Sequence, residues 1–179
     1  DAIFDDQDVP LPYMLPGDIV FLNFNYTNTS DIYIARNSEI ETIHIHGVLN
    51  NEYNPIVFGY GDEMDDDFKK IKNLNINSYL DGSKSEAYLV TDNYKRLLRY
   101  MESAPFQVVI MGHSCGNSDR TLLNTIFEHK NCISIKPCYH QNGDGSDNYK
   151  ELIQNISRNF NDMARMRDVV ACKEYCNKI

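Results

Sequence analysis

Three short motifs place chemically capable side chains directly after stretches that favour β-structure. The first, Leu22–Thr29 (LNFNYTNT), carries asparagines and threonines that are suited to bind hydroxyl and amide groups. The second, IHIHG, contains His46, whose imidazole is suited to general-base chemistry near neutral pH. The third runs from Gly112 to Asp119 (GHSCGNSD) and contains Ser114. Together these residue types indicate a site for a polar ligand.

Each motif also has a structural interpretation. Asparagine and threonine are ordinary turn residues after a strand, and a lone buried histidine is more often structural than catalytic. His44 and His46 share one face of the expected strand, which weakens that view for the second motif. Asp119 precedes an expected helix, so it either caps that helix or accepts hydroxyl groups of a ligand.

The residues Gly112–Gly116 (GHSCG) also match the G-x-S-x-G pattern of a nucleophile elbow, which would make Ser114 the nucleophile of a serine hydrolase. An α/β-hydrolase places its acid and then its histidine after the elbow. Here His129 falls near the end of the following helix, and the acidic residues follow His140, so that order is reversed. We therefore interpret the elbow as a coincidence and keep the serine hydrolase as a further alternative.

A metal site is another alternative. Cys138 and His140, together with Cys172 and Cys176, are potential zinc ligands, although nothing in the sequence fixes the distance between the two pairs. The acidic run Asp62–Asp67 has the oxygen ligands that magnesium prefers, but a solvated helix N-terminus is the simpler interpretation. We expect no metal and leave open whether the cysteine and histidine pairs bind one.

The elements that must position these motifs alternate between apolar runs and amphipathic periods. Strands are expected over residues 18–24, 41–48, 108–111 and 132–135, and helices over 94–101, 122–127 and, as one long helix, 152–163. This alternation predicts an α/β fold, partial Rossmann-like, with a mostly parallel sheet and helices on both faces. The glycine-bearing turn in the third motif lies where such sheets bind ligands, and the amides at a helix start favour an anion.

Composition narrows the class of protein. The chain has 179 residues, of which 42% are hydrophobic and 24% charged, which predicts one soluble α/β domain over 18–179 after an extended lead-in or linker over 1–17. A net charge of −9 excludes a nucleic-acid partner held through its phosphates. No apolar stretch approaches the roughly 18 residues of a membrane span. Five cysteines without framework spacing indicate free thiols and a cytoplasmic protein.

In this order, the three motifs resemble the bacterial abortive-infection AbiH family. The resemblance includes LNFNYTNT with the following Tyr33, then IHIHG and GHSCGNSDRTLLNTIFEH, and it extends through the stretch from Ile133 to Tyr175. It therefore covers most of the chain from about Gly17. AbiH proteins are in turn similar to sirtuin-like, NAD-binding Rossmann-type domains. We interpret the chain as a C-terminal portion that lacks the N-terminal glycine-rich segment expected to cradle the pyrophosphate.

The resemblance implies NAD as the bound nucleotide and assigns residues to it. Asn25 matches the sirtuin asparagine that positions the ribose and the attacking water, and His46 matches the general base. The cofactor-binding positions implied are Thr27, Gly47, Gly112, Ser114 and Asp119. Thr27 replaces an aspartate that contacts the nicotinamide amide in sirtuins, a departure that bears directly on nicotinamide recognition.

The function implied is an anti-phage abortive-infection protein of the sirtuin-like class that binds NAD or a related nucleotide. We expect the full-length protein to hydrolyse NAD to nicotinamide and ADP-ribose, and this chain alone to be inactive. The alternative is a non-catalytic nucleotide-sensing or protein-interaction module of a defence system, which Thr27 and the missing glycine-rich turn favour. The zinc ribbon of many sirtuins is absent, which argues against deacylation. Apart from a nucleotide, an oligomer or a defence partner is expected.

Overall fold

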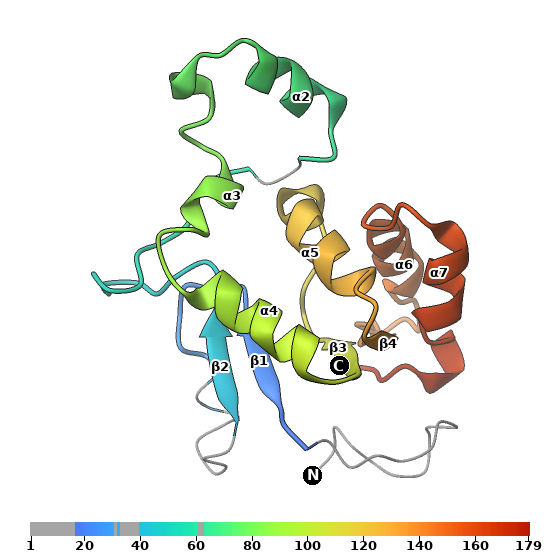
Figure 1. The fold of residues 1–179 in the computed structure, drawn as a ribbon. Coiled ribbons are helices and arrows are strands. Elements are labelled where there is room, and N and C mark those ends of the chain that lie inside the picture. The colour runs from blue at the N-terminus through green and yellow to red at the C-terminus, as the bar shows by residue number, and fades with distance from the viewer. Residues whose placement is uncertain (1–16, 31, 33–39, 61–62) are drawn as a thin grey trace.

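Short strands in two parallel pairs form the centre of the computed structural model, which describes residues 17–30, 32, 40–60 and 63–179 (Figure 1). In that part of the chain, β1 pairs with β2 and β3 pairs with β4, both in parallel. The strands are β1 (Val20–Asn23), β2 (Glu41–His44), β3 (Phe106–Ile110) and β4 (Cys132–Pro137). Parallel pairing, with helices between β2 and β3 and between β3 and β4, confirms the α/β, partial Rossmann-like fold class. Strands β1 and β2 are shorter than expected, whereas β4 extends beyond the expected Ile135 to Pro137.

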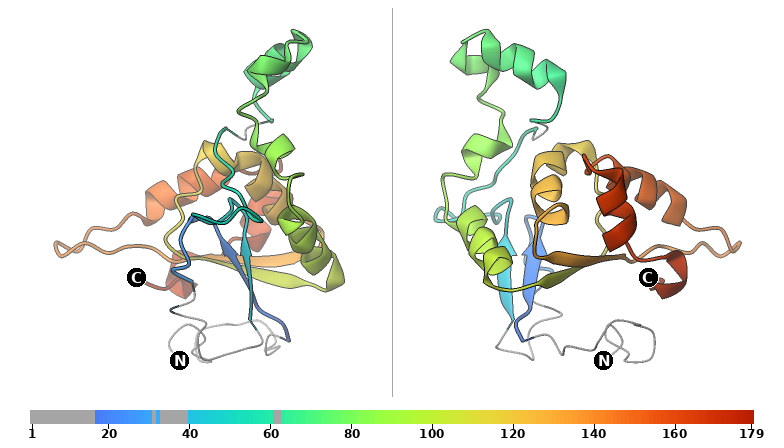
Figure 2. Two further views of the ribbon diagram at one scale, coloured as in Figure 1. Left: turned by 90° about the vertical axis from the view of Figure 1, so that its left-hand side faces the viewer. Right: turned by 45° about the vertical axis from the view of Figure 1, so that its right-hand side comes forward.

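The helices are short and follow the strands in the expected alternation. They are α2 (Asp66–Asn73), α3 (Lys84–Ala87), α4 (Asn93–Ser103), α5 (Arg120–Phe127), α6 (Tyr149–Ser157) and α7 (Met163–Val169), with 3₁₀ turns η1 (Asn77–Tyr79), η2 (Asn117–Asp119) and η3 (Lys173–Tyr175). Helix α4 packs against β2, whereas α5 and α7 pack against β4 (Figure 2). Among the described residues, no helix has the length and apolar character to cross a membrane. The lead-in expected over 1–17 lies, apart from Gly17, outside the described residues.

The strand, turn and helix predicted between Phe106 and Phe127 are present as β3, η2 and α5. The four apolar side chains that predicted the helix are all buried: Leu122, Leu123, Ile126 and Phe127. Their three- and four-residue spacing puts them on one face, which packs into the core beside β4. Strand β3 buries Phe106 and Ile110, while Val109 remains 38% exposed. The strand therefore has one covered and one partly open face.

The prediction of one long helix over residues 152–163 is wrong, because the chain breaks between α6 and α7. At the break Asn159, which is 1% exposed, turns inward and donates to the carbonyl oxygens of Cys115 and Asn155. Asp162 then begins α7 by accepting the Ala164 N–H at 2.8 Å. Apolar periodicity continued across the break, and the side-chain hydrogen bonds that end one helix and begin the next decided the structure.

Residues 63–82, called the arm here, project from the rest of the molecule in both figures. Neither α2 nor η1 buries any residue. The segment before the arm meets the end of the arm where Gly59 approaches Gly82 so closely that a Cβ at Gly59 would lie 2.1 Å from the Gly82 oxygen. The Tyr60 N–H donates to the Gly82 oxygen at 3.0 Å, and the Lys84 N–H donates to the Tyr60 oxygen at 3.0 Å. This closure returns the chain to the body at α3.

Candidate functional site

The three motifs come together beyond the carboxyl ends of their strands. Phe24, directly after β1, packs its ring 4.1 Å from the ring of His113 and 5.4 Å from that of His46. His46 follows β2 in the turn that ends the strand, and His113 follows β3. Because β1 and β2 are parallel neighbours, the first two motifs meet at one edge, whereas His113 comes from the separate pair of β3 and β4.

Asp119 is the centre of this assembly. Its Oδ1 lies 3.0 Å from Nε2 of His46 and 2.8 Å from Nζ of Lys84, and the three side chains are 9%, 5% and 7% exposed. Its Oδ2 lies 3.2 Å from the Ser118 hydroxyl and 3.6 Å from Nε2 of His113, where the contact is electrostatic rather than a hydrogen bond. Asp119 begins α5, yet its carboxylate makes no capping hydrogen bond. Of the two roles left open by the sequence, the carboxylate therefore does not serve as a cap.

The surroundings of Asp119 set its charge. Burial alone would raise the pKa of the carboxyl group, but the contacts with His113, His46 and Lys84 outweigh burial and hold that pKa well below its ordinary value. The Asp119 charge acts in turn on its neighbours. Burial, reinforced by that charge, raises the pKa of the Cys115 thiol to about 12 and that of the Tyr88 hydroxyl above its ordinary range. The site therefore holds an ionised carboxylate beside two neutral, protonated groups.

His46 is engaged on both sides of its ring. Nδ1 lies 3.2 Å from the Phe24 carbonyl oxygen, while Nε2 faces Asp119 and lies 3.2 Å from the Tyr88 hydroxyl. A carbonyl and a carboxylate both only accept hydrogen bonds, so both ring nitrogens of His46 face an acceptor. A neutral His46 able to take a proton must give up one of these contacts.

Lys84 and Tyr88 were not found by the sequence reasoning. They lie four residues apart in and just after α3, so they share one face of that short helix. The spacing alone was the available signal, and it says nothing about which surface the helix meets. Both side chains reach the site from a segment between the second and third motifs, 35 and 42 residues away from their partners.

The structure separates Asn25 and Thr27 from this buried cluster. Both are exposed, and the Thr27 hydroxyl bonds to that of Thr29 at 3.0 Å. Asn23 is the buried asparagine of the motif, and it organises the turn by accepting the Asn25 N–H and donating to the Thr27 oxygen and the Ser30 hydroxyl. The turn interpretation therefore accounts for most of the motif, and Asn25 and Thr27 both face solvent.

Gly47 and Gly112 both have positive φ, but for different surroundings. Gly47 (φ +78°) is buried, and a Cβ there would lie 2.1 Å from the Pro55 oxygen. Its glycine is thus required by the neighbouring chain. Gly112 (φ +67°) has open space where a Cβ would stand. Only Gly112 leaves room for a ligand to approach the backbone.

Ser114 is exposed at the top of the same loop, and its carbonyl accepts a hydrogen bond from Asn155. The strained residue is the next one, Cys115 (φ +54°), whereas a nucleophile elbow strains the nucleophile itself. His129 bonds instead to Glu102, at 3.4 Å. These observations favour the interpretation of the elbow as a coincidence.

The potential metal ligands do not assemble. Within the described residues no three histidine, cysteine or acidic side chains are arranged to hold a metal ion. Cys138 is buried, Cys172 is exposed, and the Cys176 thiol lies 3.3 Å from the Cys172 carbonyl oxygen. In the acidic run, Asp65 caps α2 by accepting the Asp67 N–H at 3.0 Å, in agreement with the helix N-terminus interpretation.

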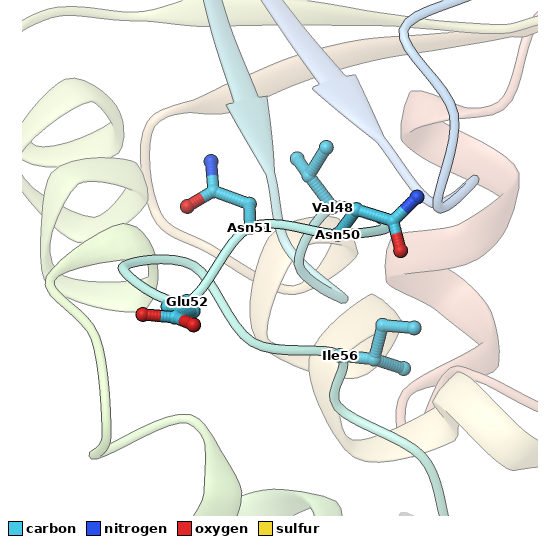
Figure 3. A pocket seen from close by; sticks show the side chains of 5 residues that line it. All are labelled: Val48, Asn50, Asn51, Glu52 and Ile56. Atoms are coloured by element: carbon cyan, nitrogen blue, oxygen red, sulfur yellow. The ribbon is translucent and has the colours of Figure 1, made fainter.

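A pocket lies on the loop after β2 (Figure 3). It is lined by Val48, Asn50, Asn51, Glu52 and Ile56. The side-chain oxygen Oδ1 of Asn51 already accepts hydrogen bonds from the Tyr53 and Asn54 N–H groups, as in an ordinary turn. None of the residues assigned to the nucleotide lines this pocket.

The family model described as "Bacteriophage abortive infection AbiH" matches residues 6–140, a span that contains all three motifs and α3. No curated protein and no solved structure matches the chain.

Proposed function

The chain belongs to the bacteriophage abortive infection AbiH family, and within that role we propose that the strand-end site binds a nucleotide of the NAD class. Family membership places the chain among proteins of phage abortive infection. The nucleotide and its identity are the proposal, and they rest on the sirtuin-like character of the motifs together with the geometry of the site.

One observation carries the proposal: His46 of the second motif and His113 of the third both lie against the carboxylate of Asp119. If the two histidines served only in packing and Asp119 only as a helix cap, we would not expect both rings to contact the Asp119 carboxylate. A carboxylate at this edge of an α/β fold is suited to accept the hydroxyl groups of a ribose.

The loop after β3 supports the fit of a nucleotide. The open space at Gly112 allows close approach to the backbone, and the exposed Ser114 hydroxyl is free to face a ligand. Asn25, also exposed, lies after β1, and the preceding Phe24 contacts this loop through His113. The ligand would thus lie over the loops, with the buried carboxylate beneath it.

Binding without turnover is the form best supported. His46 has both ring nitrogens engaged and is 4% exposed, so it is not free to take a proton in this arrangement. Thr27, in place of an aspartate, points the same way. In this form the site senses a nucleotide, and Asp119 with Ser114 holds it.

Calorimetric titration with NAD and ADP-ribose tests binding. We expect the wild-type chain to bind NAD, Ser114→Trp to lose binding by steric block, and the Ser103→Trp control to retain it, since both serines are exposed on the surface. Circular dichroism checks that the variants fold. Absence of NAD binding by the wild-type chain, or equal binding by Ser114→Trp, would end the proposal.

Hydrolysis is the second candidate, and the 3.0 Å contact of His46 with Asp119 favours it, because a histidine oriented by a carboxylate is a common general base. In this mechanism His46 would give up one of its two ring contacts and take a proton from a ribose hydroxyl or from water that Asn25 orients. NAD turnover is the measurement. Turnover that persists at the wild-type rate in His46→Ala rules this mechanism out.

A further inference from the structure

Lys84 is the most unusual charged residue outside the three motifs. It is 5% exposed, and its Nζ lies 2.8 Å from Oδ1 of Asp119. Removing an ammonium group from water costs several kcal/mol unless a counterion compensates. The other lysines that pair with aspartates in α2, Lys69 and Lys70, remain mostly exposed. A buried lysine aimed at the carboxylate of a candidate site therefore requires an explanation.

Lys84 acts on the same oxygen atom as His46. Oδ1 of Asp119 receives both Nζ of Lys84 at 2.8 Å and Nε2 of His46 at 3.0 Å. One turn later on the same face, the Tyr88 hydroxyl meets the same nitrogen of His46 at 3.2 Å. Helix α3 thus contacts both members of the histidine–carboxylate pair and fixes how they face each other.

We propose that Lys84 is a positioning residue of this site: its ammonium group keeps Asp119 ionised and holds Oδ1 toward His46, and through Asp119 it supports nucleotide binding. The last part rests on the proposed function, whereas the effect on Asp119 does not. Since no contact with the nucleotide is assigned to Lys84 itself, its effect passes entirely through the Asp119 carboxylate.

The other groups that face Asp119 define what remains when Lys84 is neutralised. His46 after β2 and His113 after β3 carry ring nitrogens toward it, and Ser118 contributes its hydroxyl. Cys115 and Tyr88 lie nearby as neutral groups. Lys84 is the one permanently charged cation among these contacts, so its loss should change the ionisation of Asp119 more than the loss of any hydroxyl.

The test is the titration of the Asp119 side-chain carboxyl carbon, followed by nuclear magnetic resonance. In Lys84→Met the midpoint is expected to rise by about one pH unit or more, as for a carboxylate that loses an adjacent cation. The Lys70→Met control removes an exposed lysine that lies 2.7 Å from Asp67, and it should leave Asp119 unchanged. A midpoint that moves no further in Lys84→Met than in Lys70→Met overturns the proposal.

Lys84→Gln provides a second variant if the methionine variant does not fold, because it keeps a donor while removing the charge. It too should raise the Asp119 midpoint. NAD affinity, measured on the same proteins, should fall about tenfold in Lys84→Met and stay at the wild-type value in Lys70→Met. If the Asp119 midpoint rises and the NAD affinity does not fall, the positioning role is refuted. If the wild-type chain does not bind NAD, the proposed function fails, and the titration still decides whether Lys84 controls Asp119.

Discussion

Two lysine–aspartate pairs in this chain have the same separation and opposite surroundings. In the site, Lys84 and Asp119 lie 2.8 Å apart with side chains 7% and 9% exposed, while on the arm Lys69 and Asp66 lie 2.8 Å apart with side chains 65% and 83% exposed. The arm pair joins residues three apart on one helix, whereas the site pair joins residues 35 apart on different elements.

The comparison shows that the distance between two charges does not by itself determine how much an ion pair contributes to stability. Water screens the arm pair and solvates either partner left alone, so such pairs contribute little. Around Asp119 water is largely excluded, and a partner left alone stays buried with its charge. The strand-end loops therefore depend on mutual compensation among charges, and the arm does not.

The largest expected effect comes from Asp119→Ala. This change leaves the Lys84 charge buried without its counterion, so the free energy of unfolding should fall by about 3–5 kcal/mol. Urea unfolding measures it. Asp66→Ala, on the arm, should produce no measurable change. Equal effects at the two sites would break the comparison.

The contribution of Asp119 to stability should also depend on pH. The pKa of Asp119 is lowered in the folded protein, so the unfolded chain binds the proton more readily and the contribution of Asp119 to stability is present above about pH 4. As the pH falls below that value, toward the folded pKa, the contribution is lost. Unfolding of the wild-type protein and of Asp119→Asn from pH 6 downward should show a stability difference that shrinks below about pH 4. A difference that is constant with pH would contradict this account.

Glycine substitution sharpens the same contrast at the level of the backbone. Gly47→Ala places a methyl group 2.1 Å from the Pro55 oxygen at φ +78°, where the left-handed conformation alone costs about 1–2 kcal/mol. We expect a loss of about 2 kcal/mol or more in thermal or urea unfolding. Gly82→Ala, at the end of the arm, has no heavy atom within 4 Å of the new methyl group and should be tolerated.

The smallest effect is expected for Tyr88→Phe, which removes the hydroxyl group near His46 but retains the ring stacked on it. A loss of about 1 kcal/mol is expected, the usual contribution of one hydrogen bond. Tyr79→Phe on the arm, where the side chain is largely exposed, is the control and should not change unfolding. If both variants match the wild-type protein, the Tyr88 hydroxyl does not contribute to the site.

The local structure around the site follows from patterns that are visible in the sequence. The apolar run and the spacing of Leu122, Leu123, Ile126 and Phe127 predicted β3 and α5 because periodicity reports which face of an element is buried. The same reasoning failed between α6 and α7, where an inward Asn159 and a capping Asp162 interrupt a continuous apolar period. Order in the chain also located the three motifs and, with them, His46 and Asp119.

The residues that surround His46 and Asp119 became clear only from the tertiary structure. Lys84 and Tyr88 lie in a segment whose sequence resembles any short polar helix, and their burial depends on the closure at Gly59 and Gly82 that returns α3 to the body. The surroundings of Asn25 and Gly47 were likewise visible only in the fold: Asn25 faces solvent, and Gly47 packs against Pro55. Contacts between residues far apart in the chain leave no local period, because they depend on where whole elements pack. For that reason the sequence predicted Asp119 and His46 as site residues, whereas the contact of Lys84 with Asp119 was visible only in the fold.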